Sequence, residues 1–326
     1  MQKIGLYLPN HLGDAVVASS LISWCAKSKL KPALIAKQYL KPLFYKDPRI
    51  STFIPVNQNY TGIVKTIRDL NKLNLTVCLV MPKSFFSAWL VWKAKVRRRA
   101  GYSFDYRKYF LNDIIPMYEY HHQPLRQFYF NLAYPYLPGS PPPYPDLFIP
   151  PADINSFSLD SDSVEQSADR IGIDPGAAYG KSKSWPDQRW IDLIKNLEKK
   201  YKVVLVGIRD LSEWEKNFNS VINLSGKTSL TELPYLLRNL KLFISGDTGS
   251  MHLAAALNVD TISLFGSSSP VWTSPWGKGR HIIIYKNLSC SPCFKKTCPK
   301  GDMKCMNSIT IEEVITKVDQ LLQSKI

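Results

Sequence analysis

The sequence predicts an α/β protein made of two domains, each with an open β-sheet covered by helices. Short apolar runs that suit buried strands alternate with stretches whose apolar residues recur at helical spacing, and this alternation occurs twice along the chain. The length of 326 residues also favours two domains over one. We therefore expect two Rossmann-like domains that face each other across a cleft.

A proline-rich stretch marks the expected boundary between the two domains. Residues 135–151 contain eight prolines, and residues 155–167 are polar and rich in serine and aspartate. Both compositions are typical of linkers. The predicted domains are therefore residues 1–150 and 151–326, with a C-terminal helix that can pack back on the first domain.

The first domain opens with a candidate site. A predicted strand at residues 3–8 is followed by the loop 9–14 and by a predicted helix at 15–26. Asp14 thus lies beyond the carboxyl end of a strand, which is the usual ligand side of an open α/β sheet. Taken alone, its simplest role is to cap the helix. The other elements expected in this domain are strands at 33–36, 53–56, 76–81 and 100–102 and helices at 63–73 and 84–94.

The second domain centres on the loop 246–249, which lies between a predicted strand and a predicted helix. Thr248 or Asp247 could cap the helix, and Gly249 would let an anion approach its amino end. This arrangement suits a phosphate beside the Asp247 carboxylate, and an ordinary capped helix is an equal alternative. His252 follows one turn later, where it can touch the same ligand or simply pack. The other elements expected here are strands at 170–174, 203–206, 221–224, 242–245 and 261–265 and helices at 190–201, 211–219, 230–240 and 250–257.

A second glycine-rich turn, at residues 176–182, nearly matches a phosphate-binding Walker loop. Three residues separate its glycines where the motif needs four, so we discount an NTPase. Lys181 and Lys183 remain at the exit of a strand, where they can hold an anion.

The chain is strongly basic, with a net charge of +16. Such an excess indicates an acidic partner, which could be a nucleic acid, an anionic membrane surface or a phosphorylated or carboxylated substrate. Part of the excess forms a basic ridge directly after the aromatic helix expected at 84–94. This ridge is either a solvated face or a surface for a membrane or an anionic substrate, and it consists of Lys93, Lys95, Arg97, Arg98 and Arg99.

No targeting or membrane-spanning segment is recognisable in the sequence. Polar residues and Pro9 interrupt the first apolar run, and the apolar stretch 84–92 is far shorter than the about 20 residues that span a bilayer. We therefore expect a cytoplasmic protein.

Four of the six cysteines lie close together near the C-terminus. Their spacing is Cys290-x2-Cys293-x4-Cys298-x6-Cys305. This spacing matches a zinc site only in part, so we predict reduced structural thiols and no bound metal.

Four blocks of the sequence resemble the ADP-heptose:lipopolysaccharide heptosyltransferases, a family with two Rossmann-like domains in the GT-B arrangement. Residues 290–306, which contain the clustered cysteines, resemble the type II enzymes of this family more than the type I enzymes. The four blocks are the Gly13-Asp14 turn and residues 174–186, 245–252 and 265–270.

The resemblance implies roles for individual residues. Asp14 matches the general base that takes the proton of the acceptor hydroxyl, with His11 as a rival base. Lys183 matches a lysine that binds the donor diphosphate, and the neighbouring Lys181 is a second candidate. The other donor contacts implied are Asp247 to the sugar, Thr248 and Gly249 to the phosphates, His252 beside them and Glu213, by a looser alignment, to the ribose.

The resemblance also implies the reaction and its setting. An acceptor hydroxyl would displace ADP from the anomeric carbon of ADP-heptose with inversion, without a cofactor or a metal. The acceptor would be the inner core of lipopolysaccharide, either Kdo-lipid A or heptosyl-Kdo-lipid A. The enzyme would work from the cytoplasm at the inner face of the inner membrane of a Gram-negative bacterium, with the basic ridge toward the acceptor and the membrane.

Two other classes stay open at this point. A sugar-nucleotide epimerase or another GT-B enzyme would share the two-domain plan. A nucleic-acid-binding protein would explain the charge, but no binding module is recognisable in the sequence, so we expect no nucleic acid partner.

Overall fold

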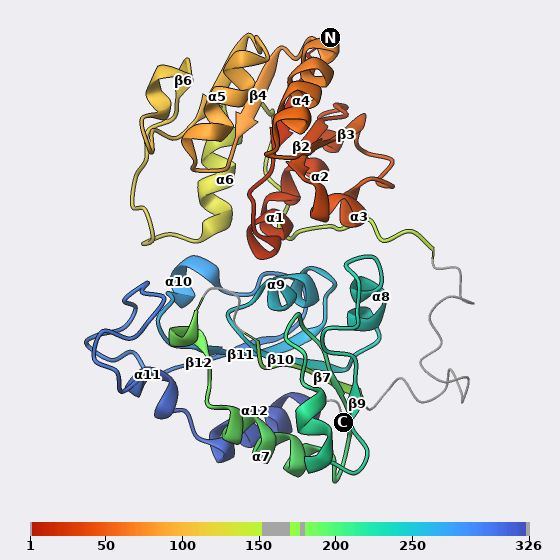
Figure 1. Cartoon of the computed structure of the whole chain (residues 1–326), viewed down its shortest axis with the longest axis vertical. Coiled ribbons are helices and arrows are strands. Elements are labelled where there is room, and N and C mark those ends of the chain that lie inside the picture. The colour runs from red at the N-terminus through yellow and green to blue at the C-terminus, as the bar shows by residue number, and fades with distance from the viewer. Residues whose placement is uncertain (1, 152–169, 177–179, 324–326) are drawn as a thin grey trace. The chain divides into compact units, whose positions relative to one another are not determined.

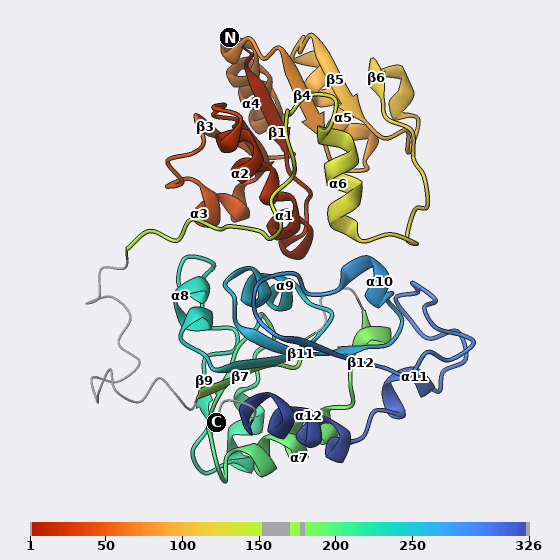
Figure 2. The same ribbon diagram turned by 180° about the vertical axis from the view of Figure 1, so that it is seen from behind.

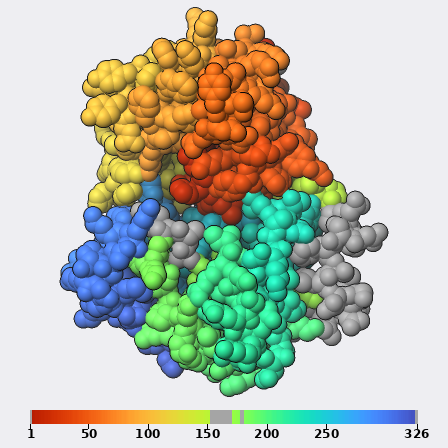
Figure 3. Space-filling model, in the orientation of Figure 1, coloured from red at the N-terminus to blue at the C-terminus, as the bar shows by residue number. Residues whose placement is uncertain are grey.

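The computed structural model describes residues 2–151, 170–176 and 180–323. The chain divides into two compact units, Met1–Pro150 and Pro151–Ile326. The first unit runs from red to yellow-green and the second from green to blue (Figure 1, Figure 3). The polar stretch 155–167 and residues 177–179 of the glycine-rich turn lie outside the described residues.

The first unit contains a parallel sheet with the strand order β3-β2-β1-β4-β5-β6. β1 pairs with both β2 and β4, so the direction in which the chain adds strands reverses between β1 and β4. Ligands of open α/β sheets bind beyond the carboxyl ends of the strands at such a switch point. The strands are β1 (Ile4–Tyr7), β2 (Ala33–Lys37), β3 (Thr52–Val56), β4 (Val77–Val80), β5 (Arg98–Gly101) and β6 (Asp113–Ile114), and the helices are α1 (Leu12–Ala18), α2 (Ser20–Lys27), α3 (Lys41–Phe44), α4 (Tyr60–Leu73), α5 (Phe85–Lys93) and α6 (Leu125–Ala133).

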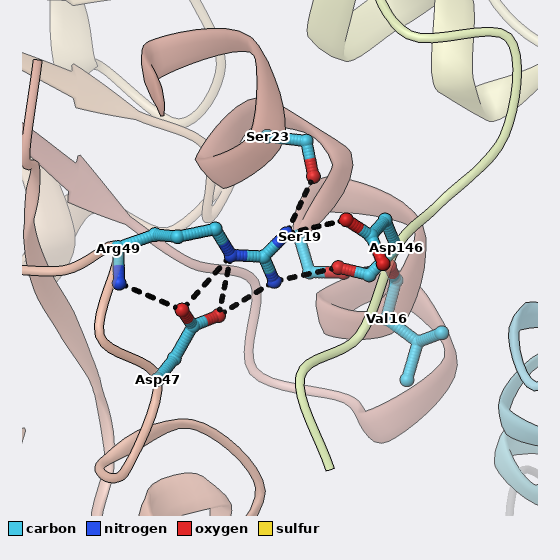
Figure 4. Close-up of polar contacts among 6 residues, drawn as sticks. All are labelled: Val16, Ser19, Ser23, Asp47, Arg49 and Asp146. Atoms are coloured by element: carbon cyan, nitrogen blue, oxygen red, sulfur yellow. Dashed lines mark hydrogen bonds and ion pairs between the residues drawn. The ribbon is translucent and has the colours of Figure 1, made fainter. Parts of the chain in front are cut away.

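The helix expected at 15–26 is two helices, because two successive serines interrupt it. The hydroxyl of Ser19 donates to the carbonyl of Val16 at 2.7 Å (Figure 4). The hydroxyl of Ser20 donates to the carbonyl of Val17 at 2.8 Å. Such bonds to the backbone one turn earlier compete with the regular helical pattern. α1 therefore ends at Ala18 and α2 begins with Ser20.

The proline-rich stretch before the unit boundary is fixed to the first unit. The Arg49 guanidinium pairs with Asp47 at 2.7 Å and with Asp146 at 2.6 Å (Figure 4). The Trp24 indole N–H donates to the carbonyl of Pro138 at 2.9 Å. This stretch therefore packs on the first unit at Pro138 and at Asp146.

The second unit contains another parallel sheet, with the strand order β12-β11-β10-β7-β8-β9. β10 pairs with β7 and with β11, which places the switch point between β7 and β10. Helices α8 and α9 cover one face of this sheet, and α7 and α12 cover the other (Figure 1, Figure 2). The strands are β7 (Arg170–Asp174), β8 (Lys202–Leu205), β9 (Ile222–Asn223), β10 (Leu242–Gly246), β11 (Asp260–Phe265) and β12 (His281–Tyr285), and the helices are α7 (Asp187–Leu197), α8 (Leu233–Arg238), α9 (Gly249–Ala256), α10 (Pro270–Thr273), α11 (Lys304–Asn307) and α12 (Ile311–Gln323).

One predicted helix of the second unit has a different form in the structure. The helix expected at 211–219 is a short 3-10 helix, Ser212–Asn217. The C-terminal helix α12 packs against α7 and β11 of its own unit. It does so because its apolar face, which includes Val314 and Val318, is buried in the core of that unit. The elements that the sequence analysis did not anticipate are β6, β12, α3, α6, α10 and α11.

Candidate active site

In the second unit, the loops that follow β7 and β10 meet at the switch point. The two strands are paired so that Ser245 lies opposite Asp174. Just beyond this pair, the hydroxyl of Ser250 donates to Asp174 Oδ2, and the Gly176 N–H donates to Asp174 Oδ1 at 2.9 Å. These bonds join the first turn of α9 to the end of β7.

Asp174 is the buried centre of this network, and the sequence analysis gave it no role. Only 6% of the residue is exposed. Burial raises the pKa of its carboxyl group to about 6, although hydrogen bonds from Ser250, the Gly176 N–H and Thr248 act in the opposite direction. Gly207 packs so closely that a Cβ there would lie 2.4 Å from Asp174 Oδ1. Its position at the end of the predicted strand 170–174 was the signal that could have identified it.

Replacing Asp174 with asparagine is expected to remove a pH dependence of stability. The folded state holds this proton more tightly than the unfolded chain, so the contribution to stability is complete below pH 3.8 and is lost as the pH rises to about 6. This pKa difference corresponds to at most about 3 kcal/mol. The free energy of unfolding, measured with urea, should fall more between pH 4 and pH 7 in the wild type than in the asparagine variant. Equal losses would mean that the carboxyl group takes up no proton in this range.

Thr248 is the N-cap of α9, which resolves the choice between Thr248 and Asp247. Its hydroxyl accepts the Met251 N–H at 3.2 Å and lies 2.7 Å from the hydroxyl of Ser250. The other N–H groups of the first turn, which begins with Gly249, lie at the carboxyl edge of the sheet. A capped helix end at this edge also favours an anion, because the helix dipole is positive there.

Three of the side chains predicted near this loop come together. Lys183 Nζ lies 2.5 Å from Asp247 Oδ2, and His252 Nε2 lies 3.9 Å from Asp247 Oδ1. The side chain of Lys183 is 16% exposed and that of Asp247 only 6%. The cluster therefore places an ammonium group, a carboxylate and an imidazole together beside the amino end of α9, largely shielded from solvent.

The two remaining donor candidates lie at the surface of this unit. Lys181 begins the short 3-10 helix Lys181–Lys183 and is exposed. Glu213 is exposed in the 3-10 helix after β8, the strand that pairs with β7. Nearby Arg209 pairs with Asp187 at 2.6 Å. This bond, and to a smaller extent the charge of Glu213, raises the pKa of Arg209.

In the first unit, Asp14 lies in the first turn of α1, beyond the carboxyl end of β1. The helix begins at Leu12 and its N-cap is His11, which is exposed and makes no capping hydrogen bond through its side chain. The expectation that Asp14 caps the helix is therefore wrong, because the helix starts earlier than the apolar spacing indicated. A carboxylate in the first turn still interacts favourably with the helix dipole.

Lys83 is a candidate that the sequence analysis missed. It follows β4, the strand that pairs with β1. Its ammonium group donates to the hydroxyl of Tyr120 and lies 4.5 Å from the centre of that ring. Burial lowers the pKa of Lys83, and the charge of Asp14 raises it by a smaller amount. The rule that selected Asp14, a polar residue beyond the carboxyl end of a strand, would have selected Lys83 too.

The basic ridge lies at the other edge of the first sheet. It runs from Lys93, at the end of α5, into the amino end of β5. Because β5, β4 and β1 are parallel, this edge is opposite the one that carries Asp14. The ridge therefore lies away from Asp14, at the opposite edge of the sheet. Lys95 and Arg97 line a groove of about 570 Å³ there.

Two arginines of the ridge make structural bonds within the first unit. Arg98 pairs with Asp113 at 2.7 Å, which joins β5 to β6. The Arg99 guanidinium donates to the carbonyl of Phe110 at 2.6 Å. The other three residues of the ridge, Lys93, Lys95 and Arg97, are exposed.

All six cysteines are free thiols within the described residues. Cys25 and Cys78 are buried. The other four belong to residues 290–305, which we call the cysteine segment, and line a cavity of about 170 Å³. Across residues 2–151, 170–176 and 180–323, no group of three or more His, Cys, Asp or Glu side chains is placed to hold a metal ion.

The geometry of the second unit defines a class of site. An open parallel sheet whose switch point carries a capped helix end and a lysine is typical of enzymes that bind phosphate-containing nucleotides. Two α/β units of this kind correspond to the GT-B plan of glycosyltransferases. The chain belongs to glycosyltransferase family 9 (heptosyltransferase), whose model matches residues 63–304.

Relatives along the full length are type 2 enzymes of this family. The chain is 26% identical to lipooligosaccharide heptosyltransferase 2 of Campylobacter jejuni, over 99% of both chains. It is 27% identical to lipopolysaccharide heptosyltransferase 2 of Escherichia coli K12, over 98% of this chain and 98% of that protein. The solved structure of E. coli ADP-heptose lps heptosyltransferase II matches with a TM-score of 0.81 at 26% identity, over 99% of both chains. These matches confirm the predicted family, fold class and likeness to type II.

Proposed function

We propose that this glycosyltransferase moves heptose from ADP-heptose to the inner core of lipopolysaccharide. The full-length similarity to type 2 heptosyltransferases carries the proposal. The pair of Lys183 and Asp247 beside the amino end of α9 supports it, because this is a suitable site for a diphosphate.

In this proposal the second unit binds the donor. The diphosphate lies at the amino end of α9, against Gly249. The Lys183 ammonium has three N–H groups, so it can serve Asp247 and a phosphate oxygen together. When the bond to ADP breaks, negative charge grows on the diphosphate, and preorganised donors at that place stabilise it by roughly 3–4 kcal/mol. Asp247 is assigned to the sugar, with His252 beside it, and no step needs a metal.

In the same proposal the first unit binds the acceptor. The acceptor hydroxyl oxygen forms a bond to the anomeric carbon, the bond from that carbon to ADP breaks with inversion, and the hydroxyl proton passes to Asp14. Burial lowers the pKa of Lys83 and the charge of Asp14 partly offsets this, so the ammonium group lies close enough to the proposed base to interact with it. The exposed His11 is the rival base.

The direct test is to incubate the purified protein with ADP-heptose and either Kdo-lipid A or heptosyl-Kdo-lipid A, and to weigh the products. We expect one of these acceptors to gain the mass of a heptose while ADP is released, with a chelator present as well as without it. Turnover of ADP-heptose in the absence of an acceptor would instead support a sugar-nucleotide epimerase. If only one of the two acceptors gains the mass of a heptose, that acceptor identifies which heptose the enzyme adds.

The exposed part of the basic ridge supports a second element of the proposal, docking on the anionic inner face of a Gram-negative inner membrane from the cytoplasm. Phe85 and Trp92, on the adjoining α5, are 46% and 43% exposed and add apolar surface. None of the helices in the described part of the chain has the length and apolar character needed to cross a bilayer. Docking would therefore depend on charge and interfacial contact, at roughly 1 kcal/mol for each basic residue near the surface.

Changing Lys93, Lys95 and Arg97 together to glutamine is expected to weaken binding to anionic vesicles by about a hundredfold. The acceptor KM should rise and lose much of its salt dependence, while the ADP-heptose KM stays the same. Sedimentation with phosphatidylglycerol vesicles measures the first effect. A matched control changes three exposed lysines of the second unit, Lys195, Lys199 and Lys200. Equal vesicle binding by both triple variants would make the ridge an ordinary solvated face.

A further inference from the structure

The cysteine segment is bonded to the short turn that carries Lys183. The Ser182 N–H donates to the carbonyl of Lys296 at 3.2 Å, and the Ser182 hydroxyl donates to the carbonyl of Lys295. The same hydroxyl lies 3.0 Å from that of Ser267. Only 2% of Ser182 is exposed, so these bonds are shielded from water. They fix the residue immediately before Lys183.

The approach between the two segments is too close for a side chain at Gly180. This glycine has φ +151°, and a Cβ there would lie 2.5 Å from the carbonyl oxygen of Lys296. The cysteine segment therefore fixes the start of the turn at Gly180, and the ion pair with Asp247 fixes its end at Lys183.

The cysteine segment is itself anchored to the sheet. The Phe294 N–H donates to the carbonyl of Ser267 at 2.7 Å, and the hydroxyl of Ser291 donates to the carbonyl of Gly266, both just beyond β11. A Cβ at Gly266 would lie 3.2 Å from the sulfur of Cys305. The segment thus connects the end of β11 to the Lys183 turn.

The four thiols surround a cavity of about 170 Å³, and Ser182 forms part of its wall. Burial raises the pKa of Cys305, and the neighbouring thiols Cys290, Cys293 and Cys298 raise it further. The close packing of such a site means that a group added to a sulfur must fill the cavity or displace its wall. In contrast, Cys25 and Cys78 are fully buried, and burial raises the pKa of each to about 12.

We propose that the cysteine segment positions Lys183 for the donor diphosphate, and that its thiols form a modification site through which electrophiles act on donor binding. The second part rests on the proposed function, because it assigns Lys183 to the diphosphate. The chemistry is an alkylation, in which a thiolate sulfur forms a bond to carbon, the leaving group departs and the thiol proton goes to the buffer. Displacing Ser182 then moves Lys183 away from Asp247 and from the amino end of α9.

Iodoacetamide is a suitable probe, because only the partly exposed thiols should react. Mass spectrometry should find label on the cysteine segment and none on Cys25 or Cys78. Calorimetry should show ADP affinity falling at least about tenfold in the labelled wild type, and staying within twofold in labelled Lys183→Ala. An unchanged affinity in the fully labelled wild type would overturn the proposal. An equal loss in both proteins, general unfolding included, would overturn it as well.

Amide hydrogen exchange separates this proposal from the proposed function. Labelling, or Ser182→Ala without labelling, should speed exchange at residues 182–184, whereas the matched variant Ser184→Ala should not. Ser182→Ala should also weaken ADP binding about fivefold, the effect of a typical lost hydrogen bond. Unchanged exchange in both the labelled protein and Ser182→Ala would refute the positioning role. Equal ADP affinity of unlabelled wild type and Lys183→Ala would instead refute the donor site and leave the exchange result standing.

Discussion

Replacing Lys183 with alanine is expected to weaken ADP binding by roughly ten- to a hundredfold and to slow transfer as well. A hydrogen bond to a charged group contributes about 1.5–3 kcal/mol. The ammonium would meet the diphosphate in the bound donor and again as ADP departs, so both the binding and the chemical step lose stabilisation. Calorimetry with ADP measures the first loss, and kcat at saturating ADP-heptose measures the second.

Lys181 provides the matched control, because it lies two positions away in the same turn but is exposed. Lys181→Ala should keep ADP affinity within about threefold. Equal losses in the two variants would show that the diphosphate does not lie at the amino end of α9. The Lys183 change also leaves the largely buried Asp247 without its ion-pair partner. Adding Asp247→Asn should therefore restore thermal stability without restoring ADP affinity.

Replacing Asp14 with asparagine is expected to lower kcat by at least about a hundredfold, with ADP affinity unchanged. Asparagine keeps the shape of the side chain but cannot accept a proton from the acceptor hydroxyl, and a positioned base contributes ~10²–10⁴-fold. The lost interaction with the dipole of α1 amounts to only about 0.3–1 kcal/mol, which is too little to unfold the unit. Steady-state rates with saturating donor and acceptor give the result.

His11 is the necessary comparison, since it occupies the N-cap position of the same helix and is exposed. We expect His11→Gln to retain most of the activity. If Asp14→Asn transfers heptose at a near-normal rate while His11→Gln does not, the base is His11. The two residues lie within one turn of each other, so both variants test the same end of α1.

Sequence patterns located elements well where one local signal was strong. The strand predicted at 170–174 has those bounds in the structure, and the strand, loop and helix around residues 242–257 are β10 and α9. Predictions failed where side chains altered the backbone locally, as at Ser19 and Ser20. Apolar spacing continues through such a break, so spacing alone indicates one helix where there are two.

The sequence by itself determined the local parts of the site. Polar residues beyond strand ends made Asp14 and Asp247 candidates, and the cap of α9 was narrowed to Thr248 or Asp247, next to the Met251 N–H that Thr248 accepts in the structure. These contacts form within one turn of the chain, so the amino-acid sequence alone can indicate them.

Only the tertiary structure decided which of these parts meet. Lys183 and Asp247 are 64 positions apart and come together because β7 and β10 are neighbours in the sheet. The bond from Lys83 to Tyr120 and those from Ser182 to the cysteine segment likewise join distant positions. Strand order and packing of the whole unit determine such contacts, and a pattern that repeats every two or four residues carries no information about them.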